Sequence, residues 1–381
     1  MDFSWTAEQE KLSRDFAKSV RETLEPTAAK RGYDASFELS ELRACGDLGI
    51  LGLSAPKDVG GRGFDRAMTA RFFEILGEDC GDMGLVFASG AHLFACVMPI
   101  VEFGTKQQLA AILPALCAGQ KICANAITED TAGSDVYALS MSAVKEGDDF
   151  VLSGEKSYVS NAKHADYLLT YAVTAPEDGF LGISAFLVPR DSAGVTVQEP
   201  FDKLGLKSLP GSRVQFDGCR VSKTCMIGES GQGGPIFTAS MEWERFGLLA
   251  AFLGLAERQL KQAIQYARKR KQFGRAISKN QAISHELVDL KMKVESARLL
   301  LYRACAKLDQ GQDAATDVAM AKLAISKAAV DCGLGALHIM GGAGYAGAHG
   351  AERGLRDALA STIASGTSEM QKDIIARELR L

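Results

Sequence analysis

Two polar stretches, Ala126-Ile-Thr-Glu-Asp-Thr-Ala-Gly-Ser-Asp135 and Tyr266-Ala-Arg-Lys-Arg-Lys-Gln-Phe-Gly-Arg275, hold most of the information about architecture and ligand. The first collects hydroxyls, acids and a glycine in a turn, where freed backbone N–H groups can cradle a phosphate or the polar edge of a ring. The second is a basic helix end closed by Phe-Gly, and its cations would suit a diphosphate. Taken alone, a solvated turn and a solvated helix face are the simpler explanations, so neither stretch identifies a ligand by itself.

Three further segments place polar or glycine residues where a packed core would not need them. Tyr158 and Ser160 share one face of a predicted strand and could contact a flat heterocycle, although ordinary sheet residues would look the same. Glycines interrupt a helical pattern in Leu337-His-Ile-Met-Gly-Gly-Ala-Gly-Tyr345, which costs stability unless the backbone must approach something closely. The last segment is Ile363-Ala-Ser-Gly-Thr-Ser-Glu-Met370, before the final helical stretch.

The pattern of apolar residues changes twice along the chain, which predicts three domains. From Thr6 to about Ala118 apolar residues recur at helical spacing. Between about Lys121 and Ile227, short β-branched and aromatic runs alternate at period two, which is typical of a small antiparallel barrel or sandwich. Long amphipathic helical stretches return from Gly233 and indicate a bundle. We therefore predict an all-α N-terminal domain at 1–120, a middle antiparallel β-barrel domain at 121–230 and a C-terminal α-helical bundle domain at 231–381.

Composition and charge exclude several classes of protein. With 43 Lys and Arg against 47 Asp and Glu, the chain lacks the positive field that holds a nucleic acid. The longest apolar stretch, Phe246–Ala256, is well short of the ~20 residues that cross a bilayer, so we expect no membrane contact. The acidic N-terminus shows no leader-like apolar core, which favours a cytoplasmic protein. The nine cysteines and five histidines show no metal-ligand spacing, so we predict reduced thiols and no metal.

The five segments, taken in this order on this domain plan, resemble the acyl-CoA dehydrogenase family of flavoproteins. The Thr-Glu-x-x-Ala-Gly-Ser-Asp and Arg-x-Gln-Phe-Gly motifs mark the resemblance, which extends over nearly the whole chain. It implies that three domains enclose FAD and that the reaction is α,β-dehydrogenation of an acyl thioester. In that reaction a carboxylate takes the α-proton while hydride passes from the β-carbon to flavin N5.

The resemblance implies an FAD site drawn from all five segments. Tyr158 stands where the family usually has Trp against the ring, and His338 stands where it commonly has Gln. Arg270, Gln272 and Phe273 match the segment that reaches the FAD of a neighbouring subunit, so the resemblance also implies a homotetramer. The matched cofactor residues are Ile127, Thr128, Gly133, Ser134, Tyr158, Ser160, Arg270, Gln272, Phe273, Gln281, His338, Gly341, Gly342, Thr367 and Glu369.

The catalytic base cannot come from the commonest family position. That pattern has Glu directly before the Gly-Thr of the last segment, but this chain has Ser365, whose alkoxide does not form near neutral pH. Glu244, at the predicted start of the first bundle helix, stands where branched-chain and long-chain members supply their base. We identify it as the base, with a pKa raised by an apolar pocket and with Arg245 positioning it or the thioester. Alternatively, Glu244 is an exposed first-turn acid that complements the helix dipole, as Glu242 is expected to be.

The residues near the base also indicate the substrate. Small Ala364 and Ser365 replace a larger pair found in straight-chain members and open space for a branch or a ring, and Trp243 is a further candidate substrate contact. The chain looks most like the branch of the family that oxidises L-prolyl groups held as thioesters on an acyl or peptidyl carrier protein. That branch produces a pyrroline or a pyrrole thioester in natural-product biosynthesis.

Two other functions stay open: a short- or branched-chain acyl-CoA dehydrogenase, and a catalytically silent flavin-binding assembly protein. Electrons would leave to an electron-transfer flavoprotein or to O2, and the sequence does not choose between them. An acidic carrier protein would need positive charge near the tunnel mouth. Lys203, Lys207 and Arg213 are the candidates, although scattered surface cations are the simpler explanation.

Overall fold

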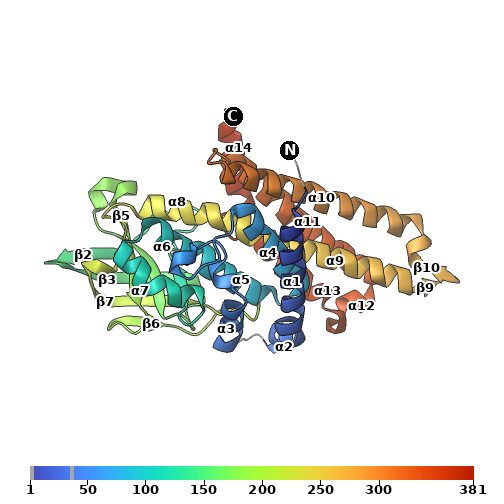
Figure 1. Cartoon of the computed structure of the whole chain (residues 1–381), viewed down its shortest axis with the longest axis horizontal. Coiled ribbons are helices and arrows are strands. Elements are labelled where there is room, and N and C mark those ends of the chain that lie inside the picture. Colours follow the sequence, from blue (N-terminus) through green and yellow to red (C-terminus); the bar gives the residue numbers. More distant parts are fainter. Residues whose placement is uncertain (1–3, 35–37) are drawn as a thin grey trace.

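The N-terminal third is helical, as its hydrophobic periodicity predicts (Figure 1). The computed structural model describes residues 4–34 and 38–381. Thr6 begins the first helix with a capping box: its hydroxyl accepts the Gln9 N–H, and the Gln9 side chain accepts the Thr6 N–H. The helices are α1 (Ala7–Thr23), α2 (Ala28–Asp34), α3 (Leu39–Asp47), α4 (Arg66–Asp79), α5 (Met83–His92), α6 (Met98–Phe103) and α7 (Lys106–Cys117).

The middle third is an eight-stranded sheet with the strand order β6-β7-β3-β2-β4-β5-β8, and β1 pairs with β4. It lies at one end of the molecule, beside α6, α7 and α8 (Gly233–Trp243) (Figure 1). Its strands are β1 (Cys123–Ala126), β2 (Ser142–Glu146), β3 (Asp149–Ser160), β4 (Tyr167–Val173), β5 (Ile183–Pro189), β6 (Val195–Val197), β7 (Gly211–Ser222) and β8 (Met226–Ile227).

The sheet is open, so the prediction of a closed antiparallel barrel is wrong. The edge strands β6 and β8 have three and two residues, and no pairing joins them within the described chain. Two pairings are also parallel: β1 with β4, and β2 with β4 at Ser142 and Val173. Closure is unnecessary because the apolar faces are buried in another way. Phe150 and Phe216 belong to the core of the sheet itself, whereas Tyr171 belongs to the core that the sheet shares with the helices.

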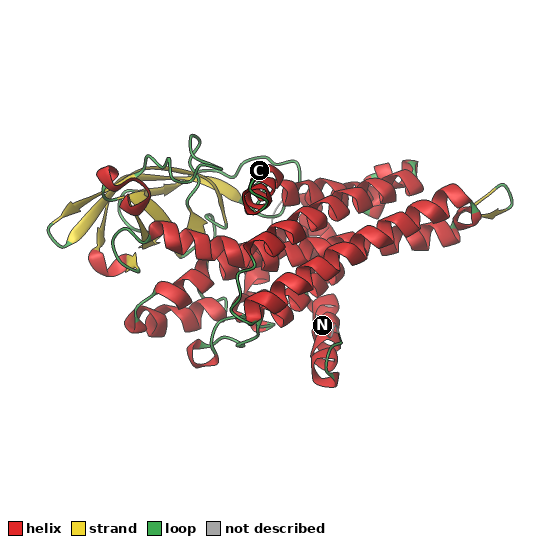
Figure 2. Ribbon diagram, turned by 90° about the horizontal axis from the view of Figure 1, so that it is seen from above, coloured by secondary structure: helices red, strands yellow, loops and turns green. Residues whose placement is uncertain are grey.

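The last third is a helical bundle, which confirms that part of the prediction. Figure 2 shows its long helices side by side, with the hairpin of β9 (Lys271–Gln272) and β10 (Arg275–Ala276) projecting beyond their ends. The remaining helices are α9 (Leu249–Lys269), α10 (Gln281–Asp309), α11 (Ala315–Met340), α12 (Gly342–Tyr345), α13 (Ala351–Leu359) and α14 (Ser368–Glu378).

Two π-helical turns, Leu93–Val97 and Glu244–Leu248, interrupt the helices where the N-terminal domain meets the bundle. They pack directly on one another, because a Cβ added at Gly247 would lie 2.4 Å from the Phe94 ring. Glycine is therefore required at 247 for this close approach. Since π-turns are rare and often mark functional sites, the second turn directs attention to its first residue, Glu244.

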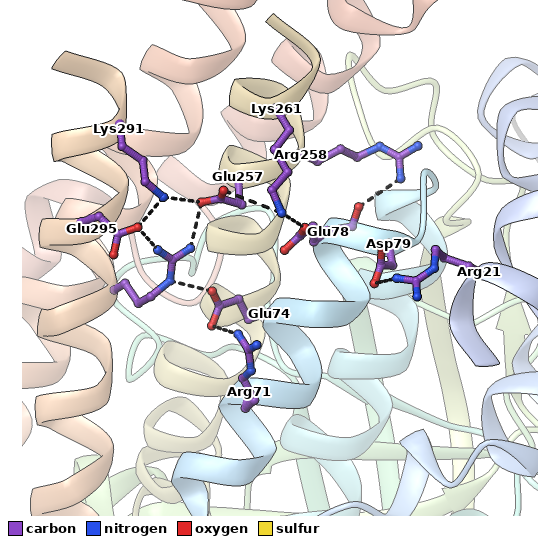
Figure 3. Close-up of polar contacts among 11 residues, drawn as sticks. Arg21, Arg71, Glu74, Glu78, Asp79, Glu257, Arg258, Lys261, Lys291 and Glu295 are labelled. Atoms are coloured by element: carbon purple, nitrogen blue, oxygen red, sulfur yellow. Dashed lines mark hydrogen bonds and ion pairs between the residues drawn. The ribbon is translucent and has the colours of Figure 1, made fainter. Parts of the chain in front are cut away.

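Buried charges join the N-terminal domain to the bundle (Figure 3). Glu74 of α4 accepts a hydrogen bond from Arg298 Nε of α10 at 2.8 Å. It also accepts one from the Tyr302 hydroxyl of the same helix at 2.5 Å. Arg298 also donates to Glu257 of α9 at 3.0 Å, and Lys291 lies 3.5 Å from the same carboxylate. Because Glu74 is almost fully buried, this network fixes α4, α9 and α10 against one another.

Within the described residues, two helical stretches are long and apolar enough to cross a membrane, although neither is an uninterrupted apolar run. They are Met83–Phe103 and Ala315–Met340. Most of Met83–Phe103 is buried inside the molecule, with 89% of its most apolar window covered. Its side chains supply the core between the N-terminal domain, the sheet and the bundle, which accounts for their hydropathy.

Candidate active site

Glu244 lies at the centre of the site as a buried carboxylate. It follows the last residue of α8 and begins the second π-turn, and only 8% of its surface is exposed. The Ser365 hydroxyl donates a hydrogen bond to Glu244 Oε2 at 2.8 Å. Burial raises the pKa of Glu244 to about 7, while the Ser365 hydrogen bond and the Arg245 charge oppose the rise. A carboxylate with this pKa can accept a proton near neutral pH.

The alternative that Glu244 is an exposed first-turn acid is wrong, because Glu244 is buried. The expectation that Glu244 lies at the start of a helix is also wrong. The preceding helix α8 already spans Gly233–Trp243, so Glu244 lies at its end. Glu242 is the solvent-facing acid of this segment: its side chain is about half exposed and lies 3.6 Å from Arg66. Residues two apart on a helix point to nearly opposite sides, so Glu242 and Glu244 lie in different environments.

Arg245 connects the π-turn to the loop that carries Ser365. Its Nε donates to the Ser365 carbonyl at 3.2 Å. Burial lowers the pKa of the guanidinium, and the neighbouring Glu244 charge opposes this effect. Ser365 has φ +53° and Gly366 has φ +87°, so the loop makes a left-handed turn at this point. Such a turn is uncommon at a residue other than glycine, and a functional reason for it is expected.

The surroundings of Glu244 are otherwise neutral. Burial first, and then the neighbouring Cys123 thiol and the Glu244 charge, raise the pKa of Cys96 well above its ordinary value. Burial also raises the pKa of Tyr171 far above its usual range. Both groups therefore stay protonated, and the site keeps a low polarity that strengthens the electrostatic interactions of Glu244.

The turn after β1 offers a backbone cradle with open space. A Cβ added at Gly133 would meet nothing within 4 Å, so a ligand can approach this backbone closely. Tyr158 on β3 is 63% exposed with φ +58°, and its ring lies 5.1 Å from that of Phe201. Ser160 follows on the same strand, and Ile127, Thr128 and Ser134 belong to the segment leading into or forming the turn. These features fit a flat ring and a phosphate.

Lys156 holds the turn in place, a role that the sequence reasoning missed. Its fully buried ammonium donates to the Ile127 carbonyl at 3.0 Å and to Glu129 Oε1 at 2.7 Å. Glu129 also accepts the Ser140 N–H at 2.7 Å, so the pair closes the turn from both sides. The available signal was a lysine within a strand, which needs a partner if it is buried.

The remaining predicted cofactor residues lie apart from this cradle. The hairpin residues Arg270, Gln272 and Phe273 occupy the opposite end of the molecule from the sheet (Figure 1). Phe273 is fully exposed, with φ +51°. One chain therefore cannot bring the two groups to the same ligand, as expected if the hairpin serves a neighbouring subunit. The other distant residues are Gln281 at the start of α10, His338 in the last turn of α11, and Gly341 and Gly342 beyond it.

The C-terminal candidates divide between the loop and the domain interface. Thr367 caps α14 through the Met370 N–H at 3.3 Å, and Glu369 pairs with Lys372 at the surface. Ala364 precedes Ser365 in the same loop. Trp243 instead faces the N-terminal domain: its Nε1 donates to Glu102 at 2.6 Å, and its ring stacks with Phe94. Its predicted substrate contact stays a prediction.

The three cations predicted for carrier docking all have partners within the chain, and two of them pair with carboxylates. Arg213 contacts Asp130 and Glu155 at 2.6 Å each, and Lys207 contacts Asp202 at 2.9 Å. Lys203 donates to the Leu209 carbonyl, and burial lowers its pKa to about 8. For Arg213 and Lys207 the structure therefore favours the simpler explanation of ordinary ion pairs within the chain.

Comparisons with known proteins identify the family of this chain. Models of the N-terminal, middle and C-terminal domains of acyl-CoA dehydrogenase match residues 6–120, 124–219 and 231–380. An L-prolyl-[peptidyl-carrier protein] dehydrogenase of Pseudomonas fluorescens is 47% identical over the full length of both chains. The prolyl acyl carrier protein oxidase AnaB has a TM-score of 0.96 at 38% identity, covering 99% of this chain and all of that one. PigA with FAD and proline has a TM-score of 0.98 at 38% identity over both whole chains. The chain belongs to the acyl-CoA dehydrogenase family.

Proposed function

We propose that this protein uses FAD to oxidise the prolyl group of an L-prolyl thioester carried by an acyl or peptidyl carrier protein. The main observation behind the proposal is Glu244, a buried carboxylate with a pKa of about 7 in the chain's second π-turn. Its place agrees with the absence of a carboxylate at Ser365. The prolyl-directed relatives support the choice of substrate.

FAD, when bound, supplies the acceptor for the hydride that leaves the β-carbon of the acyl group. The open backbone at Gly133 and the exposed ring of Tyr158 would hold its flavin and phosphate portions. Glu244 takes the α-proton onto its carboxylate, and burial makes that carboxylate basic enough to do so. Arg245 and Ser365 keep the carboxylate in place during the transfer.

An anaerobic titration tests this function. The flavin absorbance of the purified holoenzyme is followed during addition of an L-prolyl carrier protein in one cuvette and of short acyl-CoAs in another. We expect bleaching by the prolyl thioester and little by the acyl-CoAs. The reverse result would assign the enzyme to acyl-CoA oxidation, and no bleaching by either would favour a silent flavin-binding protein. Readmission of air, with or without an electron-transfer flavoprotein, then identifies the electron acceptor.

We also propose a homotetramer, supported by an apolar stripe on α10. Val288, Met292 and Leu299 lie on one helix face, and each is more than half exposed. The projecting hairpin, with exposed Phe273, would reach a neighbouring subunit from the same end of the bundle.

Met292→Asp is expected to reduce the assembly to dimers or monomers, because it places a charge within an apolar contact. Sedimentation velocity at micromolar concentration measures the change. Lys11→Asp, at an exposed position on α1, is the matched control and should leave the assembly intact. An unchanged tetramer in the Met292→Asp variant would remove the α10 stripe from the interface.

The cysteines support a cytoplasmic location as part of this proposal. All nine are free thiols, and all but Cys225 are buried. Free buried thiols are typical of proteins kept in a reducing compartment.

A further inference from the structure

We infer that Ser365 is the positioning residue of the base: its hydroxyl orients the Glu244 carboxylate and favours the ionised form that accepts the α-proton. The inference rests on the proposed function and deepens it. It gives a role to the position that, in the commonest family pattern, carries the base itself. In this chain that position serves a base supplied from another helix.

The loop around Ser365 is anchored at Ser365 itself and on both sides of it. Arg245 Nε donates to the Ser365 carbonyl at 3.2 Å, from the residue that follows Glu244. On the N-terminal side, Ser326 of α11 donates to the Ser361 carbonyl at 2.8 Å. On the C-terminal side, the Thr367 hydroxyl caps α14. These anchors keep Ser365 within hydrogen-bond distance of Glu244.

The backbone conformation supports a functional reason for serine at this position. Ser365 adopts φ +53°, a region that a residue with a Cβ enters at a cost. The following Gly366 is also left-handed, and glycine would be the least strained choice at both positions. Serine is more strained than glycine in this conformation, but its side chain carries the hydroxyl that donates to Glu244 Oε2 at 2.8 Å.

Few other groups favour the ionised form of Glu244. Among the described residues, Arg245 on the same turn is the only cation that acts on it directly, and the Ser365 hydrogen bond is the larger of the two stabilising effects. Cys96 from the first π-turn and Tyr171 from β4 face the carboxylate as neutral groups. Tyr137 and Glu242 act on Arg245, and Lys322 of α11 lies on the Arg245 side as well.

Removing the Ser365 hydroxyl should therefore change the pKa of Glu244 in a definite direction. A hydrogen bond donated to a carboxylate stabilises its charged form, so the loss of that bond raises the pKa of Glu244 above its present value of about 7. We expect a rise of about one pH unit, which lowers the ionised fraction at pH 7 from about a half to about a tenth. The limiting rate of flavin reduction at pH 7 should fall about five-fold, with the half-saturating substrate concentration unchanged.

The experiment uses Ser365→Ala and Ser365→Gly holoenzymes. Glycine tolerates the left-handed backbone, so its variant separates loss of the hydroxyl from strain in the loop. Ser368→Ala is the matched control: Ser368 is in the same segment, but its hydroxyl donates to the Thr362 carbonyl at 3.3 Å. Two quantities are measured against pH: the rate of anaerobic flavin reduction, and the infrared carbonyl band of protonated Glu244. The band is assigned by its absence in Glu244→Gln.

The two readouts separate failure of this inference from failure of the proposed function. An upward shift of both midpoints in the two Ser365 variants, but not in Ser368→Ala, supports the inference. An unshifted infrared midpoint overturns it, whatever the substrate is. A shifted infrared midpoint in an enzyme that no prolyl thioester reduces would support the role of Ser365 while rejecting the proposed substrate.

Discussion

Replacing Glu244 by Gln is expected to lower the rate of flavin reduction by the prolyl thioester by about 10³- to 10⁴-fold, the upper part of the range for loss of a general base. Gln keeps the size of the side chain and can still accept the Ser365 hydrogen bond, so the fold should be preserved. It cannot take up the α-proton. Anaerobic stopped-flow absorbance measures the rate, and the flavin content of the purified variant should match that of the wild type.

The matched control for this variant is Glu242→Gln, on the same segment. Glu242 is half exposed and pairs with Arg66 outside the site, so its replacement should leave the rate within about two-fold of wild type. The wild-type rate should also rise with pH through about 7, because the base must be ionised and burial has raised its pKa to that value. A Glu244→Gln variant within ten-fold of wild type would reject Glu244 as the base.

Replacing Glu74 by Ala should destabilise the fold by about 3–5 kcal/mol, which is typical when one partner of a buried ion pair is removed. Glu74 now accepts one hydrogen bond from Arg298 and one from Tyr302, both on α10, and the change removes this acceptor. It also removes the contact with Arg71, at 3.4 Å, in the network of Figure 3. The midpoint of urea unfolding, followed by circular dichroism, measures the loss.

A comparable acid at the surface provides the control for Glu74. Glu10 pairs with Arg14 at 3.5 Å on α1, and both side chains are more than half exposed. Glu10→Ala should therefore change stability by no more than about 0.5 kcal/mol. If the two variants unfold at the same urea concentration, the buried network does not stabilise the junction between the domains.

Local patterns were sufficient to predict the elements and the family. Helical periodicity in the first and last thirds and alternation in the middle third correspond to the observed helices and sheet. The absence of Glu at 365 showed that the base must come from elsewhere, and the resemblance to branched-chain and long-chain family members directed attention to Glu244. The assignment of helices and strands depends on neighbours within a few residues, where spacing alone determines which side chains share a face.

Pairing of strands and neutralisation of charges could not be predicted in this way. The alternating pattern indicated strands, but not that β6 and β8 would leave the sheet open, since alternation does not specify a partner. Likewise, Lys207 and Arg213 looked available for docking, and the structure pairs both with carboxylates. For Arg213 those carboxylates lie more than fifty residues away along the chain.

The sequence by itself determined the three kinds of domain, the motif of the cofactor cradle and the identity of the candidate base. Only the tertiary structure decided that Glu244 is buried, that it begins a π-turn and that Ser365 donates a hydrogen bond to it. Those two residues are 121 positions apart, and no local propensity relates them. The packing of α8, the loop before α14 and the sheet excludes water from Glu244. That exclusion, rather than the residue type, raises its pKa into the range useful for catalysis.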